Sequence, residues 1–282
     1  MSLPSSGRIG STNMIANGTD NAAVEAPSDV YMSFEDVGLT YDRAGRTAPV
    51  LAGIDVTLRR GETLCLVGAS GCGKSTLLNI AAGFLTATSG SVTAEGRAVT
   101  GPSPDRVMVF QEDATFPWFT VRQNVAYGLR ARGAPKDVME QRVAEMIDLV
   151  GLSQYADAYP HQLSGGMRKR CDMARALAVD PDSILMDEPF AALDVMTKER
   201  LQVQFREIGV RRNLTSMFVT HDLEEALFVG NRVAILRKGP GPLLALVDVP
   251  FDKGRDVSIK TRPEFQELRR ELGRRISEGN VE

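Results

Sequence analysis

Hydrophobic and polar positions divide the chain into a polar N-terminal stretch and a longer part patterned for secondary structure. Residues 1–28 are rich in Ser, Gly, Asn and Ala and hold few large apolar side chains. Such a segment cannot bury enough apolar surface to offset the entropy of ordering, so we predict a disordered tail. Beyond it, from Tyr31 to Arg60, the pattern predicts short strands, and the apolar run Thr63–Val67 predicts a buried strand. A helix is expected over Lys74–Ala82, with Gly83 ending it.

The second half of the chain predicts a helical insertion followed by more strands and helices. The pattern changes over residues 112–165, and the periodic segment 138–150 predicts an amphipathic helix within a helical lobe. Strands are expected at Ser183–Asp187 and 216–220, with a helix over Val195–Arg212 between them. Strands that alternate with helices predict an α/β fold with a parallel sheet of the doubly wound kind.

The C-terminal segment, 261–282, predicts one more helix with an apolar face. Phe265, Leu268, Leu272 and Ile276 recur every three to four residues, which is the spacing of one helix face. A helix that covers its own domain is the favoured interpretation, and a helix that binds a partner is the alternative. The main domain is then expected to span residues 29–260.

Composition narrows the classes of function. The chain has 282 residues with 33 Lys and Arg against 36 Asp and Glu, so its net charge of −3 provides no general attraction for nucleic acid. Its three cysteines, Cys65, Cys72 and Cys171, lack metal-type spacing and suit a reducing compartment. No apolar run approaches the ~18 residues of a membrane span, and no secretory signal begins the chain. We therefore expect a cytoplasmic protein that reaches a membrane only through other chains.

A glycine-rich motif of the form GxxxxGK[ST] joins the predicted strand Thr63–Val67 to the predicted helix Lys74–Ala82. A phosphate-binding loop requires this context, since glycines let backbone N–H groups and the helix N-terminus surround a phosphate. Lys74 would reach the β- and γ-phosphates of a nucleotide, and Ser75 would offer its hydroxyl to Mg²⁺. The residues expected to bind nucleotide are Gly68, Ala69, Ser70, Gly71, Cys72, Gly73, Lys74, Ser75 and Thr76.

Two carboxylates end the second predicted strand, Ser183–Asp187. Parallel sheets bind ligands at the carboxyl ends of their strands, so both side chains are expected beside the phosphate-binding loop. Asp187 would hold Mg²⁺, partly through water, and Glu188 would accept a proton from the attacking water. Alone, two acids after a strand are more often a solvated loop edge; together with the loop they indicate a nucleotide-hydrolysing site.

A second anion-binding feature lies at residues 163–167, Leu-Ser-Gly-Gly-Met, before the helix-forming run 168–178. Ser164 is a good N-cap, and Gly165 and Gly166 expose the first backbone amides of the helix. Two interpretations remain open from these residues alone. The motif is either a capped structural helix or a site for a nucleotide held by another chain.

The order of these motifs resembles that of ABC ATPases, in which the motif at 163–167, here called the signature motif, completes the ATP site of a partner subunit. Other family positions are present as Tyr41, Gln111, Asp194 and His221, and the resemblance covers residues 30–250. It implies a P-loop NTPase core with an N-terminal antiparallel β subdomain and an inserted helical subdomain at 112–165.

The resemblance also implies roles for individual residues. Tyr41 would stack on adenine, and Gln111 would touch Mg²⁺ and the attacking water. His221 would bond the γ-phosphate, so that Glu188, His221 and Gln111 form the catalytic set. The metal ligands would be Ser75, Gln111 and Asp187. Ser164, Gly165, Gly166 and Asp194 would complete the ATP site of the second subunit, most simply in a homodimer.

One residue departs from the family pattern. The signature motif commonly ends in Gln, and Met167 takes that place here. The polar contacts of that Gln are therefore not expected, whereas the cap at Ser164 remains and binding of the partner's ATP should survive.

The ending of the signature motif and the residues after Gln111 resemble the nitrate, sulfonate and taurine branch of bacterial importers. This implies an ATPase at the cytoplasmic face of the plasma (inner) membrane, bound to transmembrane permease subunits and through them to a solute-binding protein. Phe116, Trp118 and Phe119 lie where the family docks the permease, and packing within the helical lobe is the equal alternative.

Two rival functions share part of this pattern. A soluble ABC ATPase of DNA repair or translation usually carries a coiled-coil insertion or a second cassette, and neither is evident. A P-loop kinase would leave the signature motif and His221 unexplained. Nucleic acid is not an expected partner.

Overall fold

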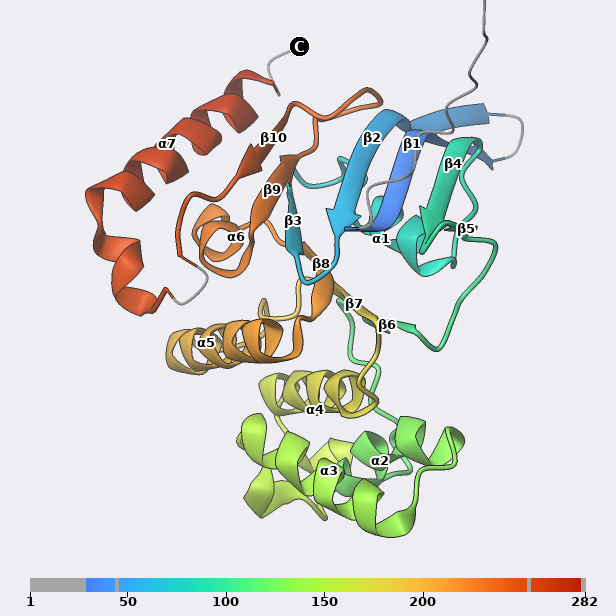
Figure 1. Cartoon of the computed structure of the whole chain (residues 1–282), viewed down its shortest axis with the longest axis vertical. Helices are drawn as coiled ribbons and strands as arrows, with labels where there is room; N and C mark the ends of the chain where they lie inside the picture. The colour runs from blue at the N-terminus through green and yellow to red at the C-terminus, as the bar shows by residue number, and fades with distance from the viewer. Residues whose placement is uncertain (1–28, 44–45, 253–254, 280–282) are drawn as a thin grey trace, which may run out of the picture.

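Two β-sheets and a helical lobe make up residues 29–43, 46–252 and 255–279, which are the residues described in this computed structural model (Figure 1). The predicted N-terminal tail, 1–28, lies outside them. The strands are β1 Val30–Arg43, β2 Arg46–Arg59, β3 Thr63–Val67, β4 Ser89–Ala94, β5 Arg97–Ala98, β6 Arg106–Val109, β7 Ser183–Asp187, β8 Thr215–Val219, β9 Arg232–Ile235 and β10 Ala245–Asp248. The α-helices are α1 Lys74–Ala82, α2 Val121–Ala131, α3 Lys136–Leu149, α4 Gly165–Ala178, α5 Val195–Arg212, α6 Leu223–Val229 and α7 Pro263–Glu278.

The central sheet has six strands in the order β10-β9-β3-β8-β7-β6. All neighbouring pairs are parallel except β10 with β9. Both faces are buried: Cys65 and Val67 of β3 join one hydrophobic core, whereas Leu64 and Leu66 join the other. A strand covered on both sides needs an unbroken apolar run, which explains the sequence of β3. The predicted α/β fold with a parallel sheet is confirmed.

The second sheet is antiparallel, in the order β2-β1-β4-β5. Its apolar side chains form one core with helix α1 and with one face of the central sheet. This arrangement matches the expected N-terminal antiparallel β subdomain. The long strand β2 also brings Val50 and Leu51 over the loop that precedes α1. The contact is close, since a Cβ at Gly73 would lie 2.6 Å from Leu51 Cδ2.

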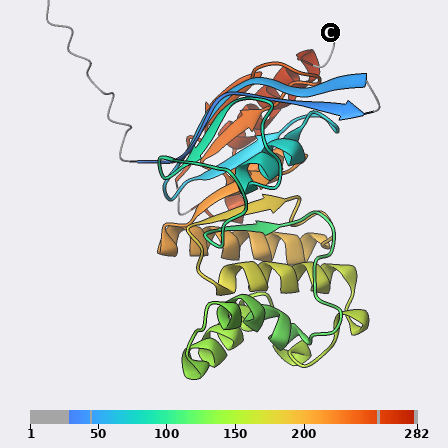
Figure 2. The same ribbon diagram turned by 90° about the vertical axis from the view of Figure 1, so that its right-hand side faces the viewer.

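The helical lobe lies at one end of the molecule, and helix α4 packs between it and the central sheet (Figures 1 and 2). Helix α2 begins at a capping box in which the Thr120 hydroxyl accepts from the backbone N–H of Gln123. Helix α3 begins at Lys136, two residues before the predicted start, and its N-cap is Pro135, with a φ of −55° and a ψ of 144°. Two short 3₁₀ helices, Ser153–Tyr155 and Pro160–Gln162, lead from α3 to α4.

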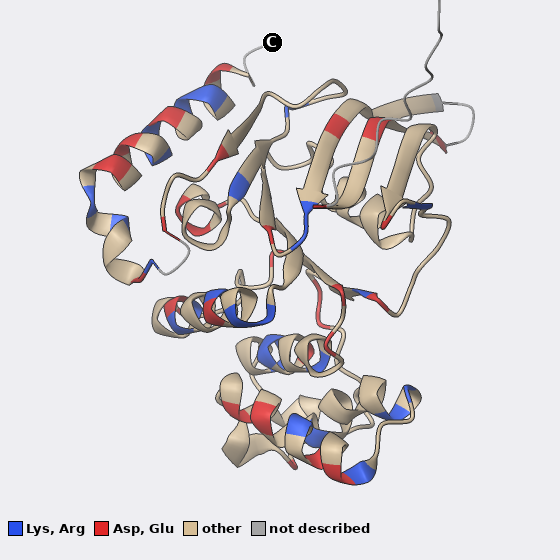
Figure 3. Ribbon diagram, in the orientation of Figure 1, with Lys and Arg blue, Asp and Glu red and all other residues tan. Residues whose placement is uncertain are grey.

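Helix α7 and a short 3₁₀ helix, Val257–Thr261, run along the outside of helix α6 (Figure 1). Phe265 and Leu272 are fully buried, and Leu268 and Ile276 pack against the same core. The helix therefore covers its own domain, as the favoured interpretation predicted. Acidic and basic residues are interspersed along α7 (Figure 3).

Strand β8 is Thr215–Val219, so the predicted strand 216–220 is wrong by one residue. Thr220 has already left the strand, and its hydroxyl accepts a hydrogen bond of 3.0 Å from the backbone N–H of Asp222. This turn presents His221 at the carboxyl edge of the sheet. None of the helices in the described ranges is long and apolar enough to cross a bilayer.

Candidate functional site

The loop between β3 and α1 has the backbone of a phosphate cradle. Gly68, Gly71 and Gly73 have φ values of 153°, 77° and 97°, which residues other than glycine rarely adopt. A Cβ at Gly68 would also lie 2.7 Å from Leu236 O and 2.8 Å from Cys72 Sγ. The backbone conformation therefore favours glycine at all three positions, and at Gly68 the surrounding space requires it as well.

Lys74 lies inside this loop. Its residue is only 7% exposed, and its ammonium donates hydrogen bonds of 3.0 Å to the carbonyl oxygens of Gly68 and Ala69. The first turn of α1 contains no acidic residue. The positive end of the helix dipole and the ammonium of Lys74 therefore both favour a negative charge at this place. The arrangement fits an anion with several negative oxygens, such as the phosphates of a nucleotide.

A cavity of about 420 Å³ opens beside the loop. This volume lies within the usual range of small-molecule sites, about 300–1,000 Å³. The loop, strand β2, the segment after β6 and the ends of β7 and β8 all contribute to its wall. The lining residues are Val50, Ser70, Gly71, Gly73, Lys74, Ser75, Thr76, Gln111, Glu188 and His221.

Asp187 supplies a buried carboxylate next to Ser75. Burial raises the pKa of the Asp187 carboxyl above its ordinary value, although its hydrogen bond with the Ser75 side chain opposes the rise. Its Oδ1 atom is buried without a hydrogen-bond partner among the described residues. An orphaned carboxylate oxygen beside a hydroxyl fits Mg²⁺, which prefers oxygen ligands.

No group of three or more His, Cys, Asp and Glu side chains within the described ranges could hold a metal ion. Mg²⁺ does not need such a cage, because it is commonly held by one or two protein oxygens together with substrate phosphates. Ser75 and Asp187 therefore suffice for a metal that arrives with a nucleotide.

Glu188 and His221 approach each other across the carboxyl edge of the sheet. His221 Nδ1 lies 3.3 Å from Glu188 Oε1, and the Glu188 side chain is 19% exposed. Glu188 has a φ of 44°, and its backbone N–H donates to Val219 O at 3.0 Å. A left-handed φ at a residue other than glycine stores backbone strain, which is common at functional sites. The turn aims the carboxylate into the cavity instead of continuing β7.

The remaining predicted nucleotide residues have different positions. Tyr41 is half-buried in β1, pairs with Ala48 of β2 and packs against the core of the antiparallel sheet. It is not among the residues that line the cavity, where β2 contributes Val50. Gly68, Ala69 and Cys72 belong to the phosphate loop without lining the cavity, and the Cys72 thiol is buried. Stacking of Tyr41 on adenine stays a prediction.

The signature motif begins helix α4, as its sequence predicts. Ser164 caps the helix, and its hydroxyl accepts a hydrogen bond of 3.2 Å from the backbone N–H of Met167. The Met167 side chain packs half-buried against the main core, so the cap forms without the usual Gln. Ser164 and Gly165 are exposed and lie outside the cavity.

Asp194 lies close to the signature motif in the fold. A Cβ at Gly166 would be 3.2 Å from Leu193 Cδ2 and 3.3 Å from Ala192 O, so glycine permits this close approach. The Asp194 carboxylate caps helix α5 by accepting from the backbone N–H of Thr197 at 3.0 Å. Ser164, Gly165, Gly166 and Asp194 thus form a second group of predicted site residues, separate from those that line the cavity.

Sequence reasoning missed an ion-pair network directly behind His221. Asp222 caps helix α6 by accepting from the N–H of Glu224 at 2.9 Å, and it pairs with Lys198 at 3.0 Å. Lys198 also pairs with the buried Glu225 at 3.1 Å. Burial would raise the pKa of Asp222, but the hydrogen bond and charge of Lys198 bring it below its ordinary value. Asp222 could have been recognised from the sequence as the N-cap of helix α6. The pairing of Asp222 with Lys198 leaves no comparable signal in the sequence.

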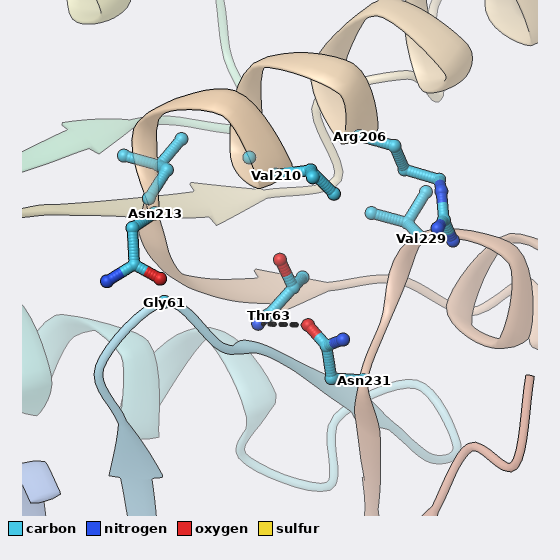
Figure 4. Close-up of a pocket in the computed structure, with 9 residues that line it drawn as sticks. Gly61, Thr63, Arg206, Val210, Asn213, Val229 and Asn231 are labelled. Carbon is cyan, nitrogen blue, oxygen red and sulfur yellow. Dashed lines mark hydrogen bonds between the residues drawn. The ribbon is translucent and has the colours of Figure 1, made fainter. Parts of the chain in front are cut away.

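A second cavity, of about 230 Å³, lies near the opposite end of β3 (Figure 4). Thr63 begins β3, whereas the phosphate loop follows Val67, so this cavity is at the amino edge of the sheet. Two of its polar side chains are already paired: the Asn231 side-chain oxygen accepts from the Thr63 N–H at 2.8 Å, and Arg206 donates to Phe228 O. It brings no nucleophile or acid-base pair together, so the cavity beside Lys74 remains the candidate site.

Comparison with known proteins agrees with this geometry. Residues 51–191 match the family model described as ABC transporter. The taurine import ATP-binding protein TauB of Rhizobium johnstonii is 44% identical over 235 residues, which cover 82% of this chain and 90% of that protein. The nitrate import ATP-binding protein NrtD of Synechocystis sp. is 41% identical over 242 residues, or 84% and 91% of the two chains.

Two solved structures are similar to the chain over 78% of its length and over the whole of their own. The dimeric structure of MJ0796, a bacterial ABC transporter cassette, gives a TM-score of 0.72 at 28% identity. A dimeric post-hydrolysis state of the same cassette, bound to ADP and Pi, gives a TM-score of 0.71 at 29% identity.

Proposed function

The chain belongs to the ABC transporter family, and from this premise we propose that it energises the import of a small anion such as taurine, another sulfonate or nitrate. ABC ATP-binding proteins are ATPases, so its reaction is the hydrolysis of ATP to ADP and phosphate. The observation that carries the proposal is the cavity in which Lys74, Ser75, Gln111, Glu188 and His221 meet. The taurine and nitrate import relatives support the importer and the class of cargo.

The residues that line the cavity divide the work of hydrolysis. Lys74 and the amides of the phosphate loop bind the β- and γ-phosphates. Glu188 accepts a proton from the attacking water, which Gln111 orients, and His221 donates to the γ-phosphate while contacting Glu188. Mg²⁺, held by Ser75, Asp187 and Gln111, would supply neutralising charge on the phosphate oxygens.

A second copy of the chain completes each site in this proposal. Ser164, Gly165, Gly166 and Asp194 lie outside the cavity of their own chain and are free to face the ATP of the other. The dimeric state of the two similar cassettes supports this assignment. ATP would then bridge the subunits, and loss of the γ-phosphate would let them separate.

The permease is proposed to dock on an aromatic patch of the helical lobe formed by Phe116, Trp118, Phe119 and Tyr127. Phe116 and Phe119 are half-buried, with ring centroids 5.8 Å apart, so they form the base of the patch. Trp118 is 66% exposed and stacks on Phe116 at 5.7 Å. An exposed tryptophan on a packed aromatic base is typical of an interface anchor.

Replacing Trp118 by alanine should weaken binding to the permease by about 30-fold or more, because interface anchors contribute roughly 2 kcal/mol or more. The ATPase activity of the isolated chain should stay within about twofold, since no catalytic group contacts this patch. Tyr155→Ala is the matched control, because Tyr155 is 44% exposed elsewhere on the same lobe. Equal recovery of the permease with Trp118→Ala and with the wild-type chain would refute the docking surface.

The cargo is tested by uptake in cells that lack this chain. We expect such cells to lose import of one of three labelled anions, taurine, a longer alkanesulfonate or nitrate. The wild-type chain should restore it, and Lys74→Ala should not. Unchanged uptake of all three anions would overturn the proposed cargo class while leaving the ATPase assignment in place.

A further inference from the structure

Helix α4 holds the segment that carries Gln111 through several charged side chains. This segment, residues 110–116, is called the Gln111 loop. Arg168 pairs with Asp113, and the Asp172 carboxylate accepts from the Ala114 N–H at 2.9 Å. Arg175 donates to Ala114 O at 2.8 Å. The helix that begins at the signature motif is thus bonded along its length to a loop that lines the nucleotide cavity.

Lys169 makes the contact nearest to Gln111. Its ammonium donates to three consecutive main-chain carbonyl oxygens: that of Phe110, that of Gln111 at 2.9 Å and that of Glu112 at 3.3 Å. An ammonium has three N–H donors and no acceptor, so three carbonyl oxygens satisfy it fully. The Lys169 side chain therefore holds the backbone of the Gln111 loop in place, and we call these three contacts the clamp.

The clamp is almost completely buried. Lys169 is 3% exposed, and the nearby Asp172 carboxylate pairs with Arg175 at 3.0 Å. Burial lowers the pKa of Lys169 below its ordinary value, and the nearby Asp172 opposes that change. Removing an ammonium from water is costly unless its donors are bonded, so the contacts with the loop fix the position of the side chain.

Lys169 is five residues from Ser164, on the same helix. A helix of this length moves as one body, so a displacement of its capped end reaches the Lys169 ammonium and the backbone of Gln111. The Gln111 side chain lines the cavity beside Lys74, whereas Ser164 lies outside it. Lys169 therefore connects the two groups of site residues by one side chain.

We propose that Lys169 is a positioning residue, which places Gln111 in the chain's own site according to the position of the signature helix at the second site. This inference rests on the proposed dimeric ATPase. ATP bound against Ser164 would fix the position of helix α4. Through the Lys169 clamp, the position of the helix would then determine where Gln111 lies. Without the clamp each site should still bind ATP, but it should no longer respond to the other.

Lys169→Met removes the ammonium and keeps an unbranched chain of similar length. For the full-length variant we expect ATP affinity within about twofold and a kcat lower by about 10- to 100-fold, since slight misplacement of a positioned group costs up to about 10²-fold. The Hill coefficient for ATP should fall towards 1. Lys169→Gln, which keeps two N–H donors, should restore part of both kcat and cooperativity.

Hydrogen exchange measured by mass spectrometry separates positioning from simple stability. Amides of residues 110–114 should exchange faster in Lys169→Met, with those of helix α4 unchanged. Lys136→Met is the control, because the Lys136 side chain is 85% exposed on the same lobe. A Hill coefficient and a kcat equal to those of the wild type would overturn the proposal. So would a parallel loss of kcat and of α4 protection that Lys169→Gln fails to repair.

The exchange experiment needs no hydrolysis, so the clamp and the proposed function can fail separately. Absence of ATPase activity in the wild-type chain would count against the function. Wild-type exchange rates at 110–114 in Lys169→Met would count against the clamp alone.

Discussion

Replacing Glu188 by glutamine should lower the kcat of ATP hydrolysis by about 10²- to 10⁴-fold, the usual contribution of a positioned general base. Glutamine has nearly the same shape but cannot accept the proton of the attacking water. ATP affinity should change by less than about threefold, because Lys74 and the phosphate loop carry most of the binding. The variant should therefore accumulate as an ATP-bound dimer, measurable by sedimentation.

Glu207→Gln is the matched control for this experiment. Glu207 is an exposed carboxylate on helix α5 that pairs with Arg211, at 3.0 Å, one turn away. Its replacement should leave kcat within about twofold, as for most surface substitutions. Rapid hydrolysis by Glu188→Gln would refute the role of Glu188, and the strain at its φ of 44° would then need another explanation.

Replacing Ser164 by arginine should prevent ATP-driven dimerisation. The new side chain would occupy the space at the open helix N-terminus that the partner's phosphates need, and losing the contacts to such a charged group at an interface costs roughly 2 kcal/mol or more. Dimerisation should weaken by at least about 30-fold. Each chain should still bind ATP, because Ser164 does not line its own cavity.

Part of any effect of Ser164→Arg will come from the lost cap. Thr120→Arg provides the comparison, because Thr120 caps helix α2 in the same lobe by accepting from the Gln123 N–H. Both changes should lower stability by about 1 kcal/mol, and only Ser164→Arg should block the dimer. Unchanged dimerisation and hydrolysis by Ser164→Arg would leave the signature motif as a structural cap alone.

The sequence was sufficient to predict an element where the residues that determine it lie within the element or directly beside it. Helix α1 occupies Lys74–Ala82 as predicted, because a phosphate loop begins it and Gly83, with a φ of 84°, ends it. Ser164 caps α4 for the same kind of reason. The buried strand Ser183–Asp187 is also as predicted, since a short apolar run between two turns favours a buried strand over other elements.

The sequence was insufficient where partners lie far apart along the chain. The contacts of Lys169 with the carbonyl oxygen of Gln111, 58 positions away, leave no pattern of type or spacing. The pairing of Lys198 with Asp222 likewise leaves no pattern in the sequence, and neither does the position of Tyr41 away from the cavity lining. Such contacts depend on how the lobe and the sheet pack together, which periodicity and caps do not encode.

The catalytic account and the transport account rest on different residues. Lys74, Glu188 and His221 meet in one cavity and support hydrolysis without reference to the permease. Trp118 lies on the surface of the helical lobe and concerns only docking. The two accounts can therefore be tested independently.

The most direct test of the central claim is capture of the tagged Glu188→Gln chain from native membranes in the presence of ATP, with mass spectrometry of the proteins that co-purify. We expect a multi-span permease and a solute-binding protein, both strongly depleted when Trp118→Ala is added. Recovery of soluble partners alone, such as nucleic-acid or ribosomal proteins, would contradict the importer and leave an ABC ATPase with a different task.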